Sequence, residues 1–497
     1  MGIRVVLFCL AVLTAGAASA GASTYLEVGD ETYAILSRLE AEGVVRSGLL
    51  ATKPLSRTEA ARLFREAEKN SEGGSEFIRS LVRELKERAM PQEPEGDGLR
   101  PLDSVYGNYI HTNADVRTLT YGAARQNAQA LNYNNDGDTY ARGSNTRAGF
   151  TSRLEDLGRF SFFLNPEYRS SGSDHDLIIR AAYGVVDLGW DLVVGKESQW
   201  WGPGHHGALL LSNNAEPFTL ARITNPEPLT LPWLFEFLGP VRISFFATEL
   251  EKDRTDIPEP YLWGMRFDFK PLVNVEIGLQ RTAFLGGRGT KDGISAWGKS
   301  FFASDAHDPG EAGDHRAGYD ITLTFPFDSQ PVQIYTEGAA EDSVNLPNQW
   351  AYLYGLYLPR LLDAERIELR VEWAETYDRH EPSTWYLHHV YTAGYTYKSR
   401  VIGHFMGTNS RDTFAELTYR VPERNARLSL FIDVLEHNIS NPVREKNMSV
   451  GLRGVAALSR KMELGVVYAL GRIENPGNER TETMETREIG GSLRYRF

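Results

Sequence analysis

The feature that most constrains this chain is an alternation of apolar and polar residues that recurs from residue 102 to the C-terminus. In residues 261–270, aromatic residues and a methionine alternate with leucine, glycine and charged residues. The same period of two appears in residues 426–432 and 489–497. Successive side chains of a β-strand point to opposite faces, so this period indicates strands with one apolar face and one polar face.

The lengths of these segments point to strands that cross a membrane. Roughly 16 to 19 of them follow residue 102, each about 9–12 residues long, which is the length that a tilted strand needs to span a bilayer. Tight connections such as 187–189 and 459–461 alternate with long ones such as 122–145 and 286–315, which are rich in Gly, Asn and Asp. This layout is typical of outer-membrane barrels. We therefore predict a mainly β fold, a large antiparallel transmembrane β-barrel over residues 102–497.

Soluble β folds also alternate, so a β-sandwich, a jelly roll and a propeller are the alternatives to the barrel. No 40-residue blade repeat is present, and no linker follows Pro101 to divide the strands into several sandwich domains. The polar positions carry charges of both signs, which suits a wet lumen better than a dry sandwich core. The chain also ends in an aromatic residue, Phe497, preceded by alternating apolar positions. Both features favour the membrane barrel.

The first hundred residues have a different pattern. Residues 1–20 combine a basic start, an apolar stretch and an Ala-Ser-Ala site, which predicts a cleaved secretory signal peptide. It contains the only cysteine, Cys9, so the exported protein does not depend on disulfides. Residues 21–90 show helical periodicity and a capping box at Ser56 and Glu59. They predict a small periplasmic helical bundle, followed by a linker at 91–101.

Composition excludes several classes of function. The net charge is −13, without a basic cluster, so we expect no nucleic-acid partner. The mean hydropathy of −0.36 excludes a bundle of membrane helices. Together with the export signal, these values predict that the protein lies in the outer membrane.

The densest unusual stretch in the chain begins at residue 199 and ends near residue 216. Indole rings beside glycines and asparagine amides suit sugar binding, because a ring stacks on the C–H face of a sugar while amides bind its hydroxyls. The alternative is a packed plug inside the barrel, with Gly and Pro setting backbone angles. The candidate glycan-binding or plug residues are Trp200, Trp201, Gly202, Pro203, His205, His206, Asn213 and Asn214.

Catalytic and metal sites are not predicted. The pairs His205-His206 and His388-His389 lack an HExxH motif or a cysteine partner, and neighbours on an extended chain point to opposite faces. Glu372 and Glu375 resemble a glycosidase pair only in residue type; we interpret Glu372 as part of a charge ladder in the lumen. We therefore expect no catalytic activity, no metal and no cofactor.

Several motifs resemble those of one known family. The run from Gln199 to Gly204, continued by Leu209 to Ala215, is similar to the signature of the capsule assembly Wzi family of outer-membrane proteins. Residues 372–376 and 388–407 resemble two further family stretches, in the same order along the chain. The resemblance covers most of the exported chain.

This resemblance implies a barrel of about 18 strands, a helical bundle on the periplasmic side and an occluded lumen. It also implies a lectin-like role: binding capsular polysaccharide or exopolysaccharide and anchoring it to the cell surface. Four arginines in or beside a long loop are candidates for contacts with an acidic glycan, but ordinary solvated loop charge is the favoured interpretation of them: Arg117, Arg125, Arg142 and Arg147. The alternatives are a diffusion porin and an envelope glycan-processing enzyme. As further partners we expect outer-membrane lipids and, during insertion, the barrel assembly machinery, with the protein a monomer.

Overall fold

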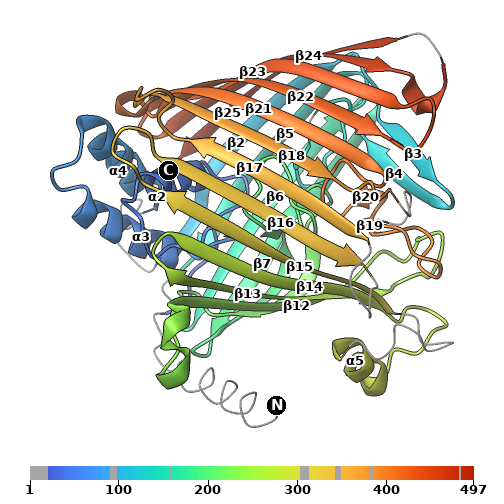
Figure 1. Ribbon diagram of the computed structural model, residues 1–497, viewed down its shortest axis with the longest axis horizontal. Helices are drawn as coiled ribbons and strands as arrows, with labels where there is room; N and C mark the ends of the chain where they lie inside the picture. Colours follow the sequence, from blue (N-terminus) through green and yellow to red (C-terminus); the bar gives the residue numbers. More distant parts are fainter. Residues whose placement is uncertain are drawn as a thin grey trace.

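A ring of 18 antiparallel strands, closed on itself, makes up most of the computed structural model (Figure 1). The structure describes residues 21–89, 98–131, 133–155, 158–302, 313–341, 349–379, 385–480 and 483–497. The signal peptide predicted at 1–20 and most of the linker predicted at 91–101 lie outside these residues. The predicted fold class and strand number are confirmed.

The long strands of the barrel follow one another around the ring in chain order. They are β2 (Leu99–Thr112), β5 (Gly143–Leu154), β6 (Phe160–Ser171), β7 (Asp174–Asp187), β8 (Asp191–Glu197), β10 (Phe218–Thr224), β12 (Pro240–Glu249), β13 (Tyr261–Leu272), β14 (Val275–Leu285), β15 (Gly313–Phe325), β16 (Val332–Glu341), β17 (Trp350–Leu358), β18 (Ile367–Glu375), β21 (Ser410–Val421), β22 (Ala426–His437), β23 (Glu445–Ser459), β24 (Met462–Glu474) and β25 (Met484–Arg496).

Shorter elements connect these strands or lie inside and beside the ring. The short strands are β1 (Thr52–Lys53), β3 (Arg117–Tyr121), β4 (Ala124–Ala128), β9 (Trp200–Trp201), β11 (Leu229–Thr230), β19 (Thr396–Tyr397) and β20 (Arg400–Val401). The helices are α2 (Thr32–Ala41), α3 (Arg57–Asn70), α4 (Glu76–Ala89) and α5 (Ile294–Phe301), with 3-10 turns η1 (Trp233–Leu238), η2 (Pro422–Arg424) and η3 (Pro476–Asn478). None of the described helices is long and apolar enough to cross a membrane.

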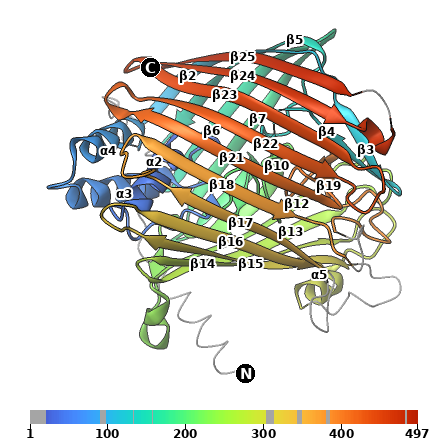
Figure 2. The same cartoon turned by 45° about the horizontal axis from the view of Figure 1, so that its top comes forward.

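The ring closes at a seam between its first and last strands. β2 pairs with β5 on one side and with β25 on the other, from Ser104 opposite Arg496 to Thr112 opposite Glu488. Figure 2 shows β25 beside β2, with the C-terminus at one end of that pair. Every strand of the ring therefore has two hydrogen-bonded neighbours, as a structure exposed to lipid requires.

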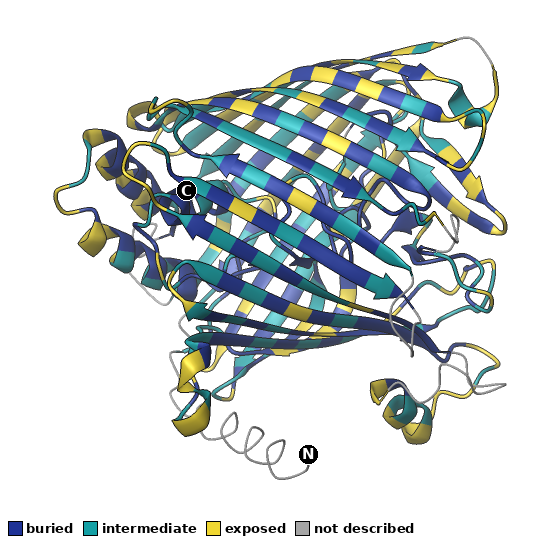
Figure 3. Ribbon diagram, in the orientation of Figure 1, coloured by how far each residue is buried: buried dark blue, intermediate teal, exposed yellow. Residues whose placement is uncertain are grey.

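The outer face of the barrel is apolar. On β22, for example, Leu428, Leu430 and Ile432 are exposed, whereas Ser429 and Asp433 between and beyond them are buried. Figure 3 shows the same alternation of exposed and buried residues along many strands. The side chains of one parity thus form a belt suited to lipid, and those of the other parity point into the lumen.

One part of the outer wall departs from this simple alternation. The expected loop at 286–315 contains the helix α5, which sequence reasoning did not find. The Trp263 side chain has the outward parity but is only 1% exposed. It lies beneath α5, where its Nε1 donates a hydrogen bond to Ser300 Oγ at 3.0 Å and its ring stacks on Phe301. A helix therefore replaces lipid on this part of the wall.

Three helices cover the end of the barrel that carries the short turns (Figure 1). Leucine, isoleucine and phenylalanine side chains of α2, α3 and α4 share one buried core. Half of the predicted capping box is present: Ser56 Oγ accepts a hydrogen bond from the Glu59 backbone N–H at 3.0 Å, but the Glu59 carboxylate binds Arg62 instead. Arg88 of α4 binds Glu463 of β24 at 2.7 Å, which ties the bundle to the barrel rim.

The N-terminal region also extends into the barrel. Tyr25 Oη donates a hydrogen bond to Asp191 of β8 at 2.6 Å. The two residues of β1 pair with β9, Thr52 opposite Trp201 and Lys53 opposite Trp200. Thr52 Oγ1 also donates to Asp268 of the wall at 2.6 Å. The helical end and the interior of the barrel are therefore one connected structure.

Candidate functional site

Three segments between barrel strands fold into the lumen, and together we call them the plug. They are residues 129–131 and 133–142, which follow β4, residues 198–217, between β8 and β10, and residues 385–409, between β18 and β21. One apolar core joins the last two segments to the wall. Its plug members include Leu209, Leu210, Tyr386, Tyr395 and Phe405, and its wall members include Phe246, Phe284, Tyr335 and Leu353. The side chains of this core join the plug to several strands around the ring.

The candidate motif at 200–214 lies in this plug. Trp200 and Trp201 are 3% and 0% exposed, and the Trp201 ring packs edge-on against Phe246 of the wall. Asn213 Nδ2 donates a hydrogen bond to Asp136 at 3.0 Å, and Asn214 Nδ2 donates to the Val401 carbonyl at 2.9 Å. The two indole rings and both amides are thus engaged inside the protein. Sugar binding by this motif stays a prediction.

The middle of the motif is less enclosed. Pro203 and His206 are partly buried, and the His205 side chain is 35% exposed. All three residues line an internal cavity of about 420 Å³ between the helical bundle and the plug. Charged side chains of both signs also line this cavity, among them Arg370, Arg420, Arg453, Glu31 and Glu416.

Two buried glutamates of the wall hold the motif by its backbone. Glu372 of β18 accepts hydrogen bonds from the N–H groups of His205 at 2.5 Å and His206 at 2.7 Å. Glu337 of β16 accepts from the N–H groups of Gly204 at 3.4 Å and Leu209 at 2.8 Å. A carboxylate that accepts backbone N–H bonds in a buried place makes strong, charge-assisted contacts. These two carboxylates therefore anchor the plug to the wall.

Gly202 is required at its position in the motif. Its φ of +133° is one that L side chains rarely adopt, and a Cβ there would lie 2.1 Å from Glu337 Oε1. A glycine thus lets the chain pass directly over the carboxylate that anchors it.

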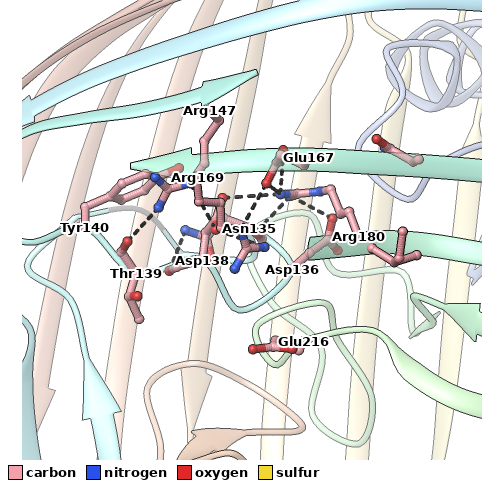
Figure 4. A network of polar contacts seen from close by, with 12 residues as sticks. Asn135, Asp136, Asp138, Thr139, Tyr140, Arg147, Glu167, Arg169, Arg180 and Glu216 are labelled. Atoms are coloured by element: carbon pink, nitrogen blue, oxygen red, sulfur yellow. Dashed lines mark hydrogen bonds and ion pairs between the residues drawn. The ribbon is translucent and has the colours of Figure 1, made fainter. Parts of the chain in front are cut away.

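The neighbouring plug segment is fixed by a charge network (Figure 4). Arg180 of β7 binds Asp136 at 3.0 Å and Asp138 at 3.2 Å, and also Glu167 of β6 at 3.2 Å. Arg147 of β5 binds Asp138 from another side at 3.3 Å. Further members of the network are Asn135, Thr139, Tyr140 and Arg169. Opposite charges balance one another here, which buried ion pairs require.

Lys53 lies where the bundle, the plug and the cavity meet. Its Nζ sits 5.1 Å from the Trp200 ring centre and 4.9 Å from that of Tyr33. Burial, with a smaller effect from the Arg370 charge, lowers the pKa of Lys53 to about 8. The cation is thus held by aromatic faces in place of water.

The other residues singled out in the sequence are scattered. Arg147 is buried in the network above, Arg117 pairs with Glu445 at 2.6 Å, Arg142 makes an exposed pair with Asp115, and Arg125 is exposed. The structure therefore does not gather the four arginines at one site. The rings of His388 and His389 lie only 4.3 Å apart, because this part of the chain is not an extended strand.

Sequence reasoning missed one group of side chains. Asp412 of β21 and Asp433 of β22 face the lumen beside His206, and one ligand atom from each of the three lies within 4.8 Å of the others. The β21–β22 hairpin sets their spacing, since Phe414 pairs with Asp433 and Asp412 with Leu435. Only knowledge of which residues pair across the β21–β22 hairpin would have identified Asp412 and Asp433 from the sequence. Nothing in the sequence indicates that His206 lies beside them.

The family model described as capsule assembly protein Wzi matches residues 118–487. The chain belongs to the capsule assembly Wzi family. The resemblance inferred from the motifs at 199–215 is thereby confirmed.

A curated relative and two solved structures show how far the similarity to known proteins extends. An uncharacterized 55.8 kDa protein in the cps region of Klebsiella pneumoniae is 26% identical over 334 residues, which cover 65% of this chain and 59% of that protein's length. The structure of Escherichia coli Wzi, an outer-membrane protein involved in group 1 capsule assembly and a carbohydrate-binding β-barrel, matches with a TM-score of 0.74 and 18% identity, covering 96% of this chain and 100% of that one. Pseudomonas aeruginosa OprD matches with a TM-score of 0.48 and 9% identity over 82% of this chain and 97% of that one. The closed barrel and its apolar belt place the protein in the outer membrane.

Proposed function

We propose that this protein binds capsular polysaccharide or exopolysaccharide at the cell surface and anchors it to the outer membrane. Membership of the capsule assembly Wzi family over residues 118–487 carries the proposal. Two of the relatives above point the same way, since one is a carbohydrate-binding barrel and the other is encoded in a cps region.

The interior of the barrel supports a binding role over a transport role. Contacts with several wall strands hold the plug in place. Glu337 and Glu372 bind its backbone, and the apolar core attaches it to the wall. A diffusion porin keeps a water-filled lumen instead. Because the plug is packed into the lumen, a glycan can bind to the surface of the barrel but has no open channel through it.

The binding surface in this proposal is the end of the barrel that carries the long connections. Short turns face the periplasm and long loops face outward in bacterial barrels, so the helical bundle lies on the periplasmic side. Many weak contacts along a polymer would combine through avidity, both from repeated sugar units and from many copies of the protein. The protein acts as a monomer embedded in outer-membrane lipid, inserted by the barrel assembly machinery.

A role without catalysis fits the environment of the glutamate that most resembles a catalytic acid. Both oxygens of Glu372 accept backbone hydrogen bonds, and Oε1 also accepts from Tyr335 Oη at 2.6 Å. Glu375, the other candidate, pairs with Arg411 at 2.6 Å. Each carboxylate thus has a structural partner. Loss of glycan turnover in Glu372→Gln would instead support the alternative function, an envelope glycan-processing enzyme.

The test is deletion of the gene followed by measurement of cell-attached and released polysaccharide. We expect the deletion strain to release more and retain less, and the intact gene supplied in trans to restore retention. Equal partition in the deletion and parent strains would contradict the proposal. In planar bilayers, we expect the purified protein to show no stable open-channel conductance, and a steady open pore would favour the porin.

A further inference from the structure

The group formed by His206, Asp412 and Asp433 has the geometry of a metal site. His206 Nε2 lies 3.5 Å from Asp433 Oδ2 and 3.8 Å from Asp412 Oδ2. These separations exceed the usual length of a hydrogen bond to nitrogen, about 2.7–3.2 Å. They are close to the roughly 3.3 Å that separates two ligands on a tetrahedral zinc ion with bonds of about 2.0–2.1 Å.

In this group the imidazole nitrogen that faces the aspartates and one oxygen of each aspartate are buried without a hydrogen-bond partner among the described residues. Asp412 and Asp433 are each 2% exposed. His206 Nε2 and the Oδ1 atoms of both aspartates make no hydrogen bond within the part of the chain that the structure describes. Two buried carboxylates side by side are costly unless a cation or a shared proton neutralises them. Buried polar atoms without partners in a native structure call for such an explanation.

The imidazole is held in a fixed orientation toward the aspartates. The His206 ring stacks on Phe414 at 3.8 Å between centres and 10° between planes, and Phe405 packs against its edge. Its backbone N–H is fixed by Glu372, and its carbonyl accepts from Asn134 Nδ2 at 2.6 Å. Neighbours thus position this ligand in advance, as preorganised metal sites require.

From this geometry we propose that His206, Asp412 and Asp433 bind one divalent transition-metal ion, with Zn²⁺ as the probe. One imidazole and two carboxylates suit Zn²⁺, and the fourth position is left for water from the adjoining cavity, which His206 and Asp433 line. Ca²⁺ prefers six to eight oxygen ligands and fits this set poorly.

The proposed ion would connect two parts of the protein. His206 belongs to the plug, whereas Asp412 and Asp433 belong to the wall strands β21 and β22. A bound ion would therefore act as a third anchor of the plug, beside Glu337 and Glu372. Metal binding would stabilise the folded protein, since the three ligands come together only when the plug is in place.

The experiment is a titration of the detergent-purified full chain, first dialysed against a chelator, with Zn²⁺ alone. We expect one ion per chain, a rise in Tm with added Zn²⁺, weaker binding as the pH falls below the range in which histidine is neutral, and little competition from an equal concentration of Ca²⁺. Asp433→Asn and, separately, Asp412→Asn should each weaken binding at least about tenfold. The matched control is His205→Gln, because His205 points toward Glu416, 3.9 Å away, and not toward the aspartates; it should keep the affinity.

Three results would overturn the proposal. They are no stoichiometric Zn²⁺ binding by the parent protein, unchanged affinity in both aspartate variants, and equal loss of affinity in His205→Gln. The first would assign a shared proton to the two aspartates in place of an ion. Circular dichroism of each variant shows whether it is folded. If one aspartate variant fails to fold, the other and the anomalous signal of zinc in a crystal of the parent protein decide the question.

Discussion

Replacement of Glu372 by glutamine tests whether this carboxylate anchors the plug. Glu372 is 2% exposed and accepts three hydrogen bonds, from the N–H groups of His205 and His206 and from Tyr335 Oη. In Glu372→Gln the side chain has the same size, but one carboxylate oxygen becomes an NH₂ group. That group faces a backbone N–H, and two donors cannot bond to each other.

The expected cost follows from the bonds that are lost. A hydrogen bond to a charged group contributes about 1.5–3 kcal/mol, and at least one of the three is removed. A loss of about 2 kcal/mol corresponds to a roughly 30-fold increase in the population of the opened plug, since about 1.4 kcal/mol is a factor of ten. The barrel itself should remain intact, because its strand pairing does not involve this side chain.

Hydrogen exchange of the peptide that spans residues 200–212 measures this opening. We expect its slowest amides to exchange about 30-fold faster in Glu372→Gln than in the parent protein. The matched control is Glu375→Gln, three residues along β18. Its carboxylate pairs with a partly exposed Arg411, so the change should cost no more than about 1 kcal/mol and leave exchange at 200–212 unaltered. Equal protection of this peptide in Glu372→Gln and the parent would refute the anchoring role.

Three further changes test other parts of the structure. Gly202→Ala places a Cβ 2.1 Å from the Glu337 carboxylate in a strained backbone conformation, so we expect a destabilised plug and a lower Tm. An unchanged Tm would contradict the close packing of Gly202 against Glu337. Arg180→Met leaves three carboxylates without their shared cation, and we expect a loss of about 3–5 kcal/mol and faster proteolysis in residues 129–142; resistance equal to the parent would count against the network. Burial would raise the pKa of Asp30, but the Arg88 charge and hydrogen bonds from Thr32 lower it to about 2. Its folded pKa thus lies below its unfolded value near 3.8, so about 2 kcal/mol of stability is present above pH 4 and is lost as the pH falls toward 2. Acid titration of Asp30→Asn should lack this part of the loss, and parallel curves for the two proteins would refute the assignment.

The barrel could be predicted from the sequence because the pattern that indicates each strand lies within that strand's own residues. Each strand carries its own alternation, and residues 426–432 show it without reference to any other part of the chain. Strand after strand of the same kind then leaves few architectures other than a closed ring. The alternation along each strand also predicts which charged side chains, such as that of Asp433, face the lumen.

The plug could be predicted only as one of two alternatives. Residues 199–216 have no period, so their partners are set by the wall and not by their neighbours in the chain. Nothing near Trp201 indicates that its ring packs against Phe246, or that Glu337 binds the backbone beside it. The helix α5 was missed for a similar reason, since its eight residues are stabilised by contact with Trp263 on another segment.

The seam between β2 and β25 makes residues 484–496 a condition for closing the ring. β25 hydrogen-bonds to β24 along one edge and to β2 along the other. A polypeptide that stopped before residue 484 would leave two unpaired strand edges facing hydrocarbon, each open N–H or C=O costing several kcal/mol. Loss of this one strand therefore opens the whole ring, at a free-energy cost that the surrounding lipid cannot offset.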